Sequence, residues 1–300
     1  MQILIIGSMG FIGYHLKRYL RQALHEVYEC DIIKNSDQKN YIRLDTDKFD
    51  YDILFNSNKY DVCINCSGAA NVSKSFDDII SDFELNAYNV LKFLEVIRKV
   101  NPECKFINIS SAAVYGNPIK IPIEEKTELL PISPYGYHKL ISEYILDEYN
   151  KLWGIKTCSV RIFSAYGNGL KKQILYDISK KILMEEEVHL FGTGNETRDF
   201  IHIDDICQAI ECIIKADNFR SSKINVANGE QIAISEIIEI FNKLWRHNKK
   251  IVFNGVEKQG DPVNWCADIN LLRSYGYRQT VNINDGVERY INWIQSEKLV

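Results

Sequence analysis

The chain opens with an apolar strand, a glycine turn and a helical pattern, an order that few folds use. Residues 2–6 are a continuous apolar run of strand length, the turn from Gly7 to Gly13 follows at once, and the helical pattern continues to Leu20. In such a turn Gly7 permits the tight bend, Gly10 lets the backbone approach a pyrophosphate, and Gly13 lets the helix pack close to the strand. The spacing GxxGxxG differs from the GxGxxG of ordinary dinucleotide folds, but its place between strand and helix predicts a dinucleotide site.

Strand-like and helical segments alternate through the first half of the chain. The strand-like runs are 2–6, 26–30, 61–66, 104–109 and 156–162, and the helical patterns lie near 11–24, 76–100 and 135–152. This rhythm predicts an α/β protein with a doubly wound parallel sheet. The segment after the second strand is short and polar, so we expect an abbreviated crossover there.

The pattern changes after residue 165. Strand-like pieces at 188–191 and 224–227 are interleaved with helical patterns near 170–185, 204–216 and 233–247. They predict a smaller mixed α/β lobe in the C-terminal part. We expect a dinucleotide-binding domain over 1–165, to which segments near 200–227 return, and a substrate-binding lobe over 166–300.

Asp31 follows the second strand, about 20 residues beyond the glycines. At that place a carboxylate accepts hydrogen bonds from the adenosine ribose diol and repels a 2′-phosphate, which favours NAD over NADP. The nearby Lys34 weakens that preference and leaves NADP possible. Asp31 can equally be a turn residue after a strand.

Tyr135 and Lys139 are four residues apart in a helical pattern, so their side chains point to one face. The Lys139 ammonium would stabilise the Tyr135 phenolate and lower its pKa from the ~10 of a free tyrosine toward that of a general base. This spacing predicts proton-transfer chemistry. The alternative is a solvated helix face with no chemical role.

Composition excludes several classes of protein. The net charge of −4 and the pI near 5.9 argue against a nucleic-acid surface. No apolar run approaches the ~18 residues of a membrane span, and Met1 leads directly into the first strand, so we expect neither a membrane segment nor a signal peptide.

The eight cysteines predict reduced, buried thiols and hence a cytoplasmic protein. Cys63 and Cys66 have metal-ligand spacing, but in a strand residues three apart face opposite ways. With no second CxxC and no HExxH we expect no metal site.

Three segments together resemble a known family: the glycine turn, the run 109–116 (ISSAAVYG) and the run 134–139 (PYGYHK). The resemblance is to the extended short-chain dehydrogenase/reductases of the NAD-dependent epimerase/dehydratase family, which act on nucleotide sugars. It continues through 161–163, 192–202, Gly260-Asp261 and 267–268. It implies a Rossmann fold for the first domain.

The resemblance implies a role for each matched residue. Ser111 would hydrogen-bond the reacting hydroxyl beside the base Tyr135, with Lys139 supporting the phenolate and the nicotinamide ribose. Asp45 would accept a hydrogen bond from the adenine amine, and the loop of Cys66, Ser67 and Gly68 would lie along the pyrophosphate and ribose. The remaining cofactor contacts would come from Phe11, Ile12, Thr46, Asn86 and Phe163.

The resemblance also implies a substrate site. Arg198 would grip the diphosphate, Asp261 would follow Gly260 in the matched segment, and Phe191 would line the nucleobase site or else belong to the core. Two positions depart from relatives: Ser164 stands where they carry Asn, and Lys258 where epimerases carry a second arginine. Trp265 would border the sugar near its 2-substituent, or would be a buried aromatic between the lobes.

The residues narrow the reaction. Sugar dehydratases carry Asp-Glu where this chain has Ala112-Ala113, and decarboxylating relatives carry a glutamate nearby. We therefore expect neither dehydration nor decarboxylation. Reversible oxidation at the 4-hydroxyl of a nucleotide-activated sugar remains, with a nucleotide-sugar 4-epimerase as the first expectation. A 4-keto-6-deoxysugar reductase and a non-catalytic NAD-binding regulator stay as alternatives. The apolar helices near 76–100 and 135–152 would form a homodimer through a four-helix bundle, as in relatives.

Overall fold

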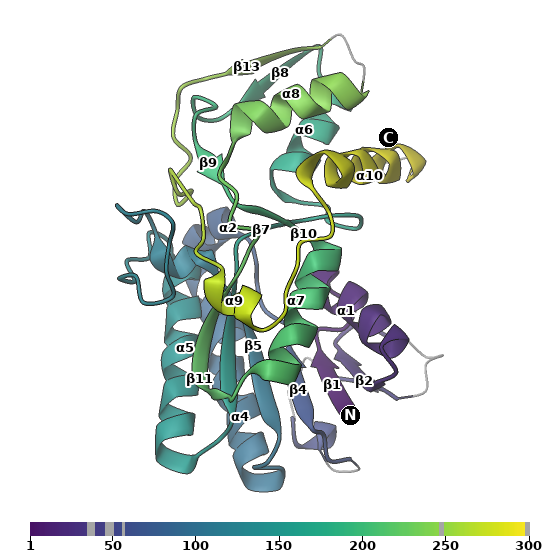
Figure 1. The fold of residues 1–300 in the computed structure, drawn as a ribbon, viewed down its shortest axis with the longest axis vertical. Helices are drawn as coiled ribbons and strands as arrows, with labels where there is room; N and C mark the ends of the chain where they lie inside the picture. Colours follow the sequence, from purple (N-terminus) through teal and green to yellow (C-terminus); the bar gives the residue numbers. More distant parts are fainter. Residues whose placement is uncertain (35–39, 46–50, 56–57, 246–248, 298–300) are drawn as a thin grey trace.

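The computed structural model describes the whole chain except residues 35–39, 46–50, 56–57, 246–248 and 298–300. Its centre is a seven-stranded parallel sheet with the strand order β11-β6-β5-β4-β1-β2-β3. The strands are β1 Gln2–Ile6, β2 Glu26–Asp31, β3 Tyr41–Arg43, β4 Val62–Asn65, β5 Lys105–Ser111, β6 Thr157–Ile162 and β11 Arg220–Val226. The expected doubly wound α/β sheet is therefore present (Figure 1).

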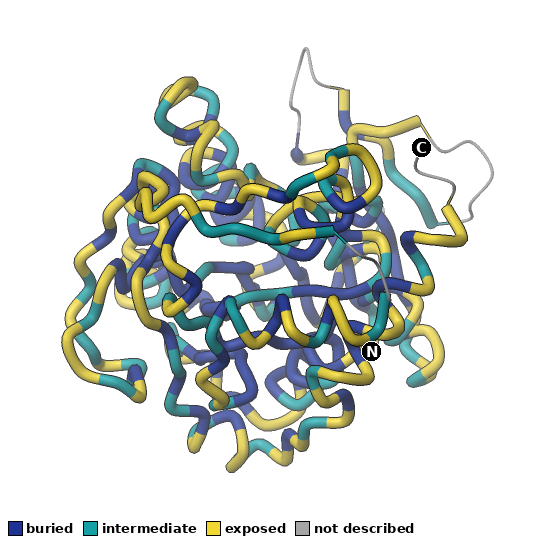
Figure 2. The backbone as a smooth tube through the Cα atoms, turned by 90° about the horizontal axis from the view of Figure 1, so that it is seen from above, coloured by how far each residue is buried: buried dark blue, intermediate teal, exposed yellow. Residues whose placement is uncertain are grey.

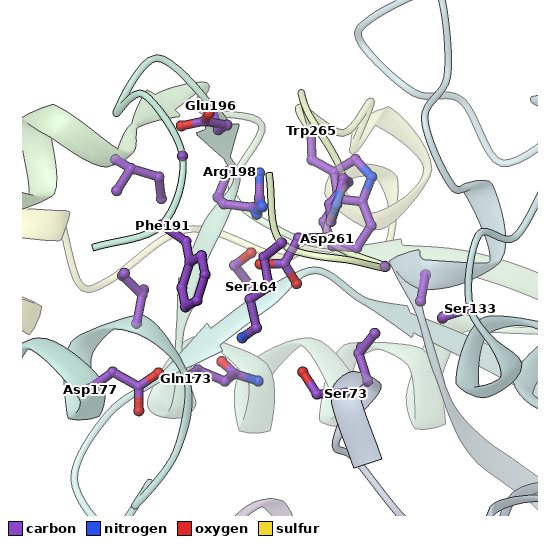
Figure 3. Close-up of a pocket in the computed structure, with 18 of the residues that line it drawn as sticks. Ser73, Ser133, Ser164, Gln173, Asp177, Phe191, Glu196, Arg198, Asp261 and Trp265 are labelled. Carbon is purple, nitrogen blue, oxygen red and sulfur yellow. The ribbon is translucent and has the colours of Figure 1, made fainter. Parts of the chain in front are cut away.

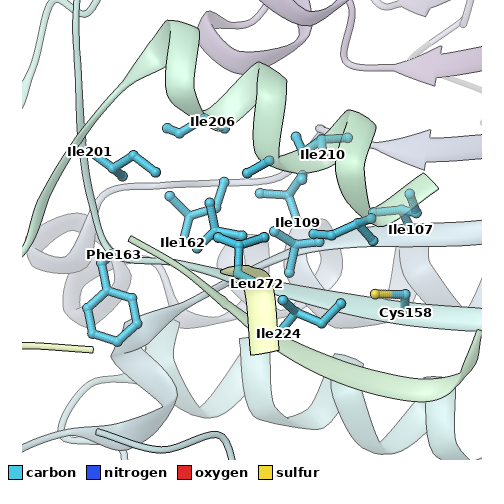
Figure 4. Packing of buried hydrophobic residues seen from close by; sticks show 14 of the residues in the cluster. Ile107, Ile109, Cys158, Ile162, Phe163, Ile201, Ile206, Ile210, Ile224 and Leu272 are labelled. Atoms are coloured by element: carbon cyan, nitrogen blue, oxygen red, sulfur yellow. The ribbon is translucent and has the colours of Figure 1, made fainter. Parts of the chain in front are cut away.

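The central strands β1 and β4 are largely apolar and buried because both faces of the sheet are covered. Ile3 and Ile5 pack in the cluster that holds Leu16 of α1 (Phe11–Gln22) and Ile206 of α7 (Ile203–Ala216). Figure 4 shows Ile206 and Ile210 of α7 lying over Ile107 and Ile109 of β5.

The alternate residues of the same strands pack on the opposite face. Leu4 and Ile6 lie in the cluster with Phe93 of α4 (Asn89–Val100) and Leu146 of α5 (Pro134–Trp153). Figure 2 shows buried segments filling the interior of the body and exposed residues on its outside.

The helix expected near 76–100 is divided. It consists of α2 (Val72–Asp77), α3 (Ile79–Phe83), a π turn at Glu84–Tyr88 and then α4. Asp78, with φ −133° and ψ 71°, interrupts the helix, and its side chain accepts a hydrogen bond from the backbone N–H of Ser81. Single π turns are frequent at functional sites.

The smaller lobe has its own core. Helices α6 (Gln173–Met184), α8 (Ile234–Trp245) and α10 (Ile283–Ser296) pack with the parallel pair β8 (Glu187–Leu190) and β13 (Lys250–Phe253). Two further pairs are the parallel β7 (Ser164–Tyr166) with β10 (Phe200–His202) and the antiparallel β9 (Thr197–Arg198) with β12 (Ile232–Ala233). Short helices complete the described elements: η1 Asp52–Leu54, η3 Ala112–Tyr115 and α9 Asn270–Ser274.

The chain passes between the lobes more than once. After β6 it enters the smaller lobe through β7 and α6, and it returns to the large sheet with α7 and β11. The strand expected at 224–227 begins earlier, at Arg220, and pairs in parallel with β6 at the edge of the large sheet. Both lobes therefore reach the carboxyl ends of the sheet strands, where ligands bind in such folds.

Candidate active site

The glycine turn and the loop after β4 meet where the strand order reverses. β1 lies between β2 and β4, so the connections from β1 and β4 run in opposite directions. Gly7 has φ +78°, and a Cβ placed there would lie 2.7 Å from the backbone nitrogen of Ser67. The close approach of the two loops therefore requires glycine at position 7.

Gly13 fixes the start of α1 against the same turn. A Cβ at this residue would lie 2.2 Å from the carbonyl oxygen of Gly7. Gly10 is the N-cap of α1 and has no side chain to satisfy the first N–H groups of the helix, which suits an anion. Phe11 and Ile12 pack partly buried against the core beneath.

Asp31 lies beside the glycine turn at the end of β2. Its carboxylate accepts hydrogen bonds from the backbone N–H groups of Met9 (2.8 Å) and Ile32 (2.8 Å), so it also holds the turn in shape. Asp45 lies on the neighbouring edge, two residues after β3, and is exposed. Thr46 lies outside the described residues.

The other expected cofactor residues surround this point. Cys66, Ser67 and Gly68 follow β4, and the Ser67 hydroxyl donates to Asn65 Oδ1 at 2.5 Å. Asn86 is buried in the π turn, and neither its amide nitrogen nor its oxygen has a hydrogen-bond partner within the described part of the chain. The same holds for the buried hydroxyl of Ser8, which sequence reasoning missed. Buried polar atoms without partners beside the glycines of these two loops fit a dinucleotide.

The three expected catalytic side chains come together. Ser111 ends β5, and Tyr135 lies in the first turn of α5, where Ser133 caps the helix by accepting from the Gly136 N–H. Lys139 follows one turn later, with its Nζ 5.8 Å from the centre of the Tyr135 ring. Its ammonium donates to the carbonyl of Ile109 at 2.9 Å.

The expected lowering of the Tyr135 pKa is wrong for this structure. Burial raises the pKa of Tyr135 to about 12, and the hydrogen bond with Ser111 only partly opposes this. Burial also lowers the pKa of Lys139 to about 8. The expectation considered the attraction between the two groups but not the cost of charging them away from water.

A cavity of about 760 Å³ opens beside Ser111 and Tyr135 and continues into the smaller lobe. All the expected substrate residues line it: Ser111, Ser164, Phe191, Arg198, Lys258, Asp261 and Trp265. Figure 3 shows Arg198, Asp261 and Trp265 on one side and Gln173 and Asp177 of α6 on another.

Arg198 and Trp265 are positioned by neighbouring carbonyls. Arg198 Nη1 donates to the carbonyl of Thr197 at 2.9 Å, and its guanidinium lies 5.9 Å from the Trp265 ring centre. The Trp265 indole N–H donates to the carbonyl of Gly116 at 3.0 Å, and its ring meets Phe163 edge-on at 5.7 Å. Trp265 is thus both buried and part of the cavity wall.

Several cavity residues were not predicted. Asn117, Lys172, Gln173 and Asp177 line the wall, and Lys172 Nζ donates to the carbonyl of Ala70 at 3.3 Å. The glycines at 167 and 169 and the paired lysines before α6 mark this turn in the sequence. They do not show that it faces the cavity.

A buried ion pair ties α5 to the sheet next to the site. Glu143 accepts from Arg161 Nη2 at 2.6 Å and from the Ser110 hydroxyl at 2.6 Å. Arg161 Nη1 donates to the Tyr115 hydroxyl and to the carbonyl of Glu125, each at 2.8 Å. The pair sets helix α5 against β5 and β6.

No three His, Cys, Asp or Glu side chains among the described residues gather into a metal site, and none of the described helices is long and apolar enough to cross a bilayer. Cys63 and Cys66 pack in clusters on opposite faces of the sheet.

Known proteins resemble this chain over almost its full length. A putative UDP-glucose 4-epimerase of Methanocaldococcus jannaschii is 25% identical over 304 residues, covering 98% of each chain. A UDP-glucuronate 4-epimerase of Thermodesulfobacterium geofontis is 25% identical over 310 residues, covering 97% of this chain and 95% of that one.

A solved structure has the same fold as this chain. UDP-glucuronic acid 4-epimerase from Bacillus cereus, in complex with UDP-glucuronic acid and NAD, superposes with a TM-score of 0.89 at 26% identity, covering 99% of this chain and 100% of that one. The model of the NAD dependent epimerase/dehydratase family matches residues 3–227. With the glycine turn, the Tyr135–Lys139 spacing and the strand order, this match shows that the chain belongs to the NAD dependent epimerase/dehydratase family.

Proposed function

We propose that the chain is a nucleotide-sugar 4-epimerase that acts on a UDP-linked hexose or hexuronate. The observation that carries this proposal is that Ser111 and Tyr135 line the same cavity as Arg198, with the Lys139 ammonium 5.8 Å from the Tyr135 ring centre. The relatives are described as a putative UDP-glucose 4-epimerase and a UDP-glucuronate 4-epimerase, which supports the choice of the nucleotide.

The residues divide the work at the sugar. NAD, when bound, supplies the acceptor and donor for the hydride at C4. Tyr135 takes the proton of the 4-hydroxyl and later returns it, while Ser111 holds the same oxygen by a hydrogen bond. Lys139 supplies positive charge next to the phenol, and Arg198 holds the diphosphate as a planar donor.

The glycine turn, Asn86 and the loop after β4 would hold the dinucleotide. A 4-keto-6-deoxysugar reductase would use the same three side chains but release its cofactor in each turnover. Asp31, at the ribose end of the turn, supports NAD and hence a retained, recycled cofactor. The absence of disulfides among the eight cysteines, all of which are described and free, supports action in the cytoplasm.

The test needs no added cofactor. Purified protein is incubated with UDP-glucose, UDP-glucuronate and UDP-N-acetylglucosamine, and the 4-epimers are followed by proton NMR, with Tyr135→Phe as the control. We expect a 4-epimer to form in wild type and turnover to fall ~10²–10⁴-fold in the variant. NAD released on denaturation would confirm a retained cofactor. An NAD-loaded protein that forms no 4-epimer, or one that only consumes NADPH with a 4-keto sugar, would refute the epimerase.

A further inference from the structure

Asp82 and His138 form a buried pair beside the catalytic helix. His138 Nδ1 donates to Asp82 Oδ2 at 2.6 Å, because a carboxylate can only accept. Asp82 comes from α3 and is 3% exposed, and His138 comes from α5 and is 7% exposed. The second oxygen of Asp82, Oδ1, is buried and has no hydrogen-bond partner among the residues that the structure describes. A buried carboxylate with one free oxygen is costly, so it calls for a reason.

The pair joins α3 to α5, the helix that carries Lys139. His138 is the residue before Lys139, and Asn86 is four residues after Asp82 on the helical segment that includes the π turn. A Cβ on Gly68 would lie 2.6 Å from Asn86 Oδ1 and 3.5 Å from Lys139 Nζ, so this segment meets the lysine head there. The negative charge of Asp82 raises the pKa of both Lys139 and Tyr135. It adds to the larger effect of burial on Tyr135 and opposes the larger effect of burial on Lys139.

The other charged or titratable groups that face Lys139 are Cys66 after β4, Glu143 on α5 and Lys172 before α6. Burial raises the pKa of the Cys66 thiol to about 12, so it is neutral. Glu143 is already bound by Arg161 and Ser110, and Lys172 is itself a cation. Asp82 differs from Glu143, because its bonded partner is the imidazole of His138 and no lysine or arginine of the described residues is bonded to it.

We propose that Asp82 is a positioning residue for the Tyr135–Lys139 pair: its carboxylate supplies a buried negative charge on the segment that packs against the start of α5, and His138 holds that carboxylate in position. The proposal rests on the epimerase function for its kinetic readout. It concerns the charge next to the base and adds no step to the reaction.

The first experiment compares Asp82→Asn with wild type. Asparagine keeps the shape and can still accept from His138, but it has no charge. We expect the pH profile of kcat/KM to move to lower pH by about one pH unit, since removing a negative charge makes both Tyr135 and Lys139 lose their protons more easily. Asp78→Asn is the matched control, because it removes the same charge from the exposed N-cap of the same helix; its profile should match wild type.

A direct titration separates this inference from the proposed function. Lysine labelled with nitrogen-15 is followed by NMR across pH, with Lys139→Met to assign the signal. The Lys139 signal should titrate at lower pH in Asp82→Asn than in wild type, whether or not any UDP-sugar is turned over. If wild type converts no sugar but the Lys139 signal still titrates at lower pH in Asp82→Asn than in wild type, the epimerase is refuted and the positioning role stands.

The role of His138 has its own pair of variants. His138→Asn keeps a donor for Asp82, so its pH profile and Lys139 titration should stay close to wild type. His138→Leu removes the hydrogen bond that holds the Asp82 carboxylate in position, so this variant should behave like Asp82→Asn. Asp82→Asn that lowers kcat or the melting temperature with an unmoved profile and an unmoved Lys139 signal would show a purely structural pair and overturn the proposal.

Discussion

Glu143→Gln should destabilise the protein more than any ordinary surface change. Glu143 and Arg161 are 1% and 2% exposed, and the guanidinium would be left buried without its counter-charge. Breaking a buried pair on one side costs about 3–5 kcal/mol. At ~2.1 cal/mol/K per residue, a chain of 300 residues has an unfolding entropy of about 0.6 kcal/mol/K, so a loss of about 4 kcal/mol lowers Tm by about 6 °C.

Calorimetry of wild type and variant measures this shift directly. The matched control is Glu187→Gln, which breaks the exposed Lys250–Glu187 pair and should change Tm by less than about 1 °C. A double variant, Glu143→Leu with Arg161→Met, removes both charges and should recover part of the loss. A Tm that falls by less than about 2 °C in Glu143→Gln, or a double variant less stable than the single one, would refute the argument from burial.

Three further predictions concern the ligands and the assembly. Because the Asp31 carboxylate lies beside the glycine turn, where it would meet the adenosine ribose, titration should show tighter binding of NAD than of NADP; equal or tighter NADP binding would favour the reductase. The outer face of α3 and α5 exposes Ile79, Ile80, Phe83 and Tyr144, and Ile80 is 75% exposed, so light scattering should show a homodimer that Ile80→Glu converts to monomer; a monomeric wild type at micromolar concentration would contradict this. Trp265 stands rigidly in the cavity wall, so wild type should prefer a free 2-hydroxyl, and Trp265→Ser should raise kcat/KM for N-acetylhexosamine relative to hexose; an unchanged ratio would make Trp265 a core residue only.

The parts of the fold that sequence predicts well are those with a long, simple pattern. The strands β4 and β6 begin and end within one residue of their predicted ranges, and every residue of both strands is buried. β3 has three residues and β9 and β12 have two each, too short for any period to show. The break at Asp78 was also missed, because the apolar spacing continues across it.

The candidate site, like the fold, could be predicted only in part. The motifs were enough to select residues from both lobes that line one cavity, from Ser111 to Trp265. They could not give the pKa of Tyr135, which depends on how deeply the folded chain buries it. Nor could they show that Asp82 and His138, 56 residues apart, are in contact, since no local pattern joins them.

The repeated passage of the chain between the lobes limits how one lobe can be exchanged between proteins. A fragment ending near residue 165 would lack β11 and α7, and so would lose an edge strand and part of the cover of the sheet. The lobes therefore cannot be divided by a single cut, and exchanging one between relatives means matching every junction at once. Substitutions within the smaller lobe are under no such constraint. Substitutions can thus alter the cavity wall on that side while the seven-stranded sheet stays as it is.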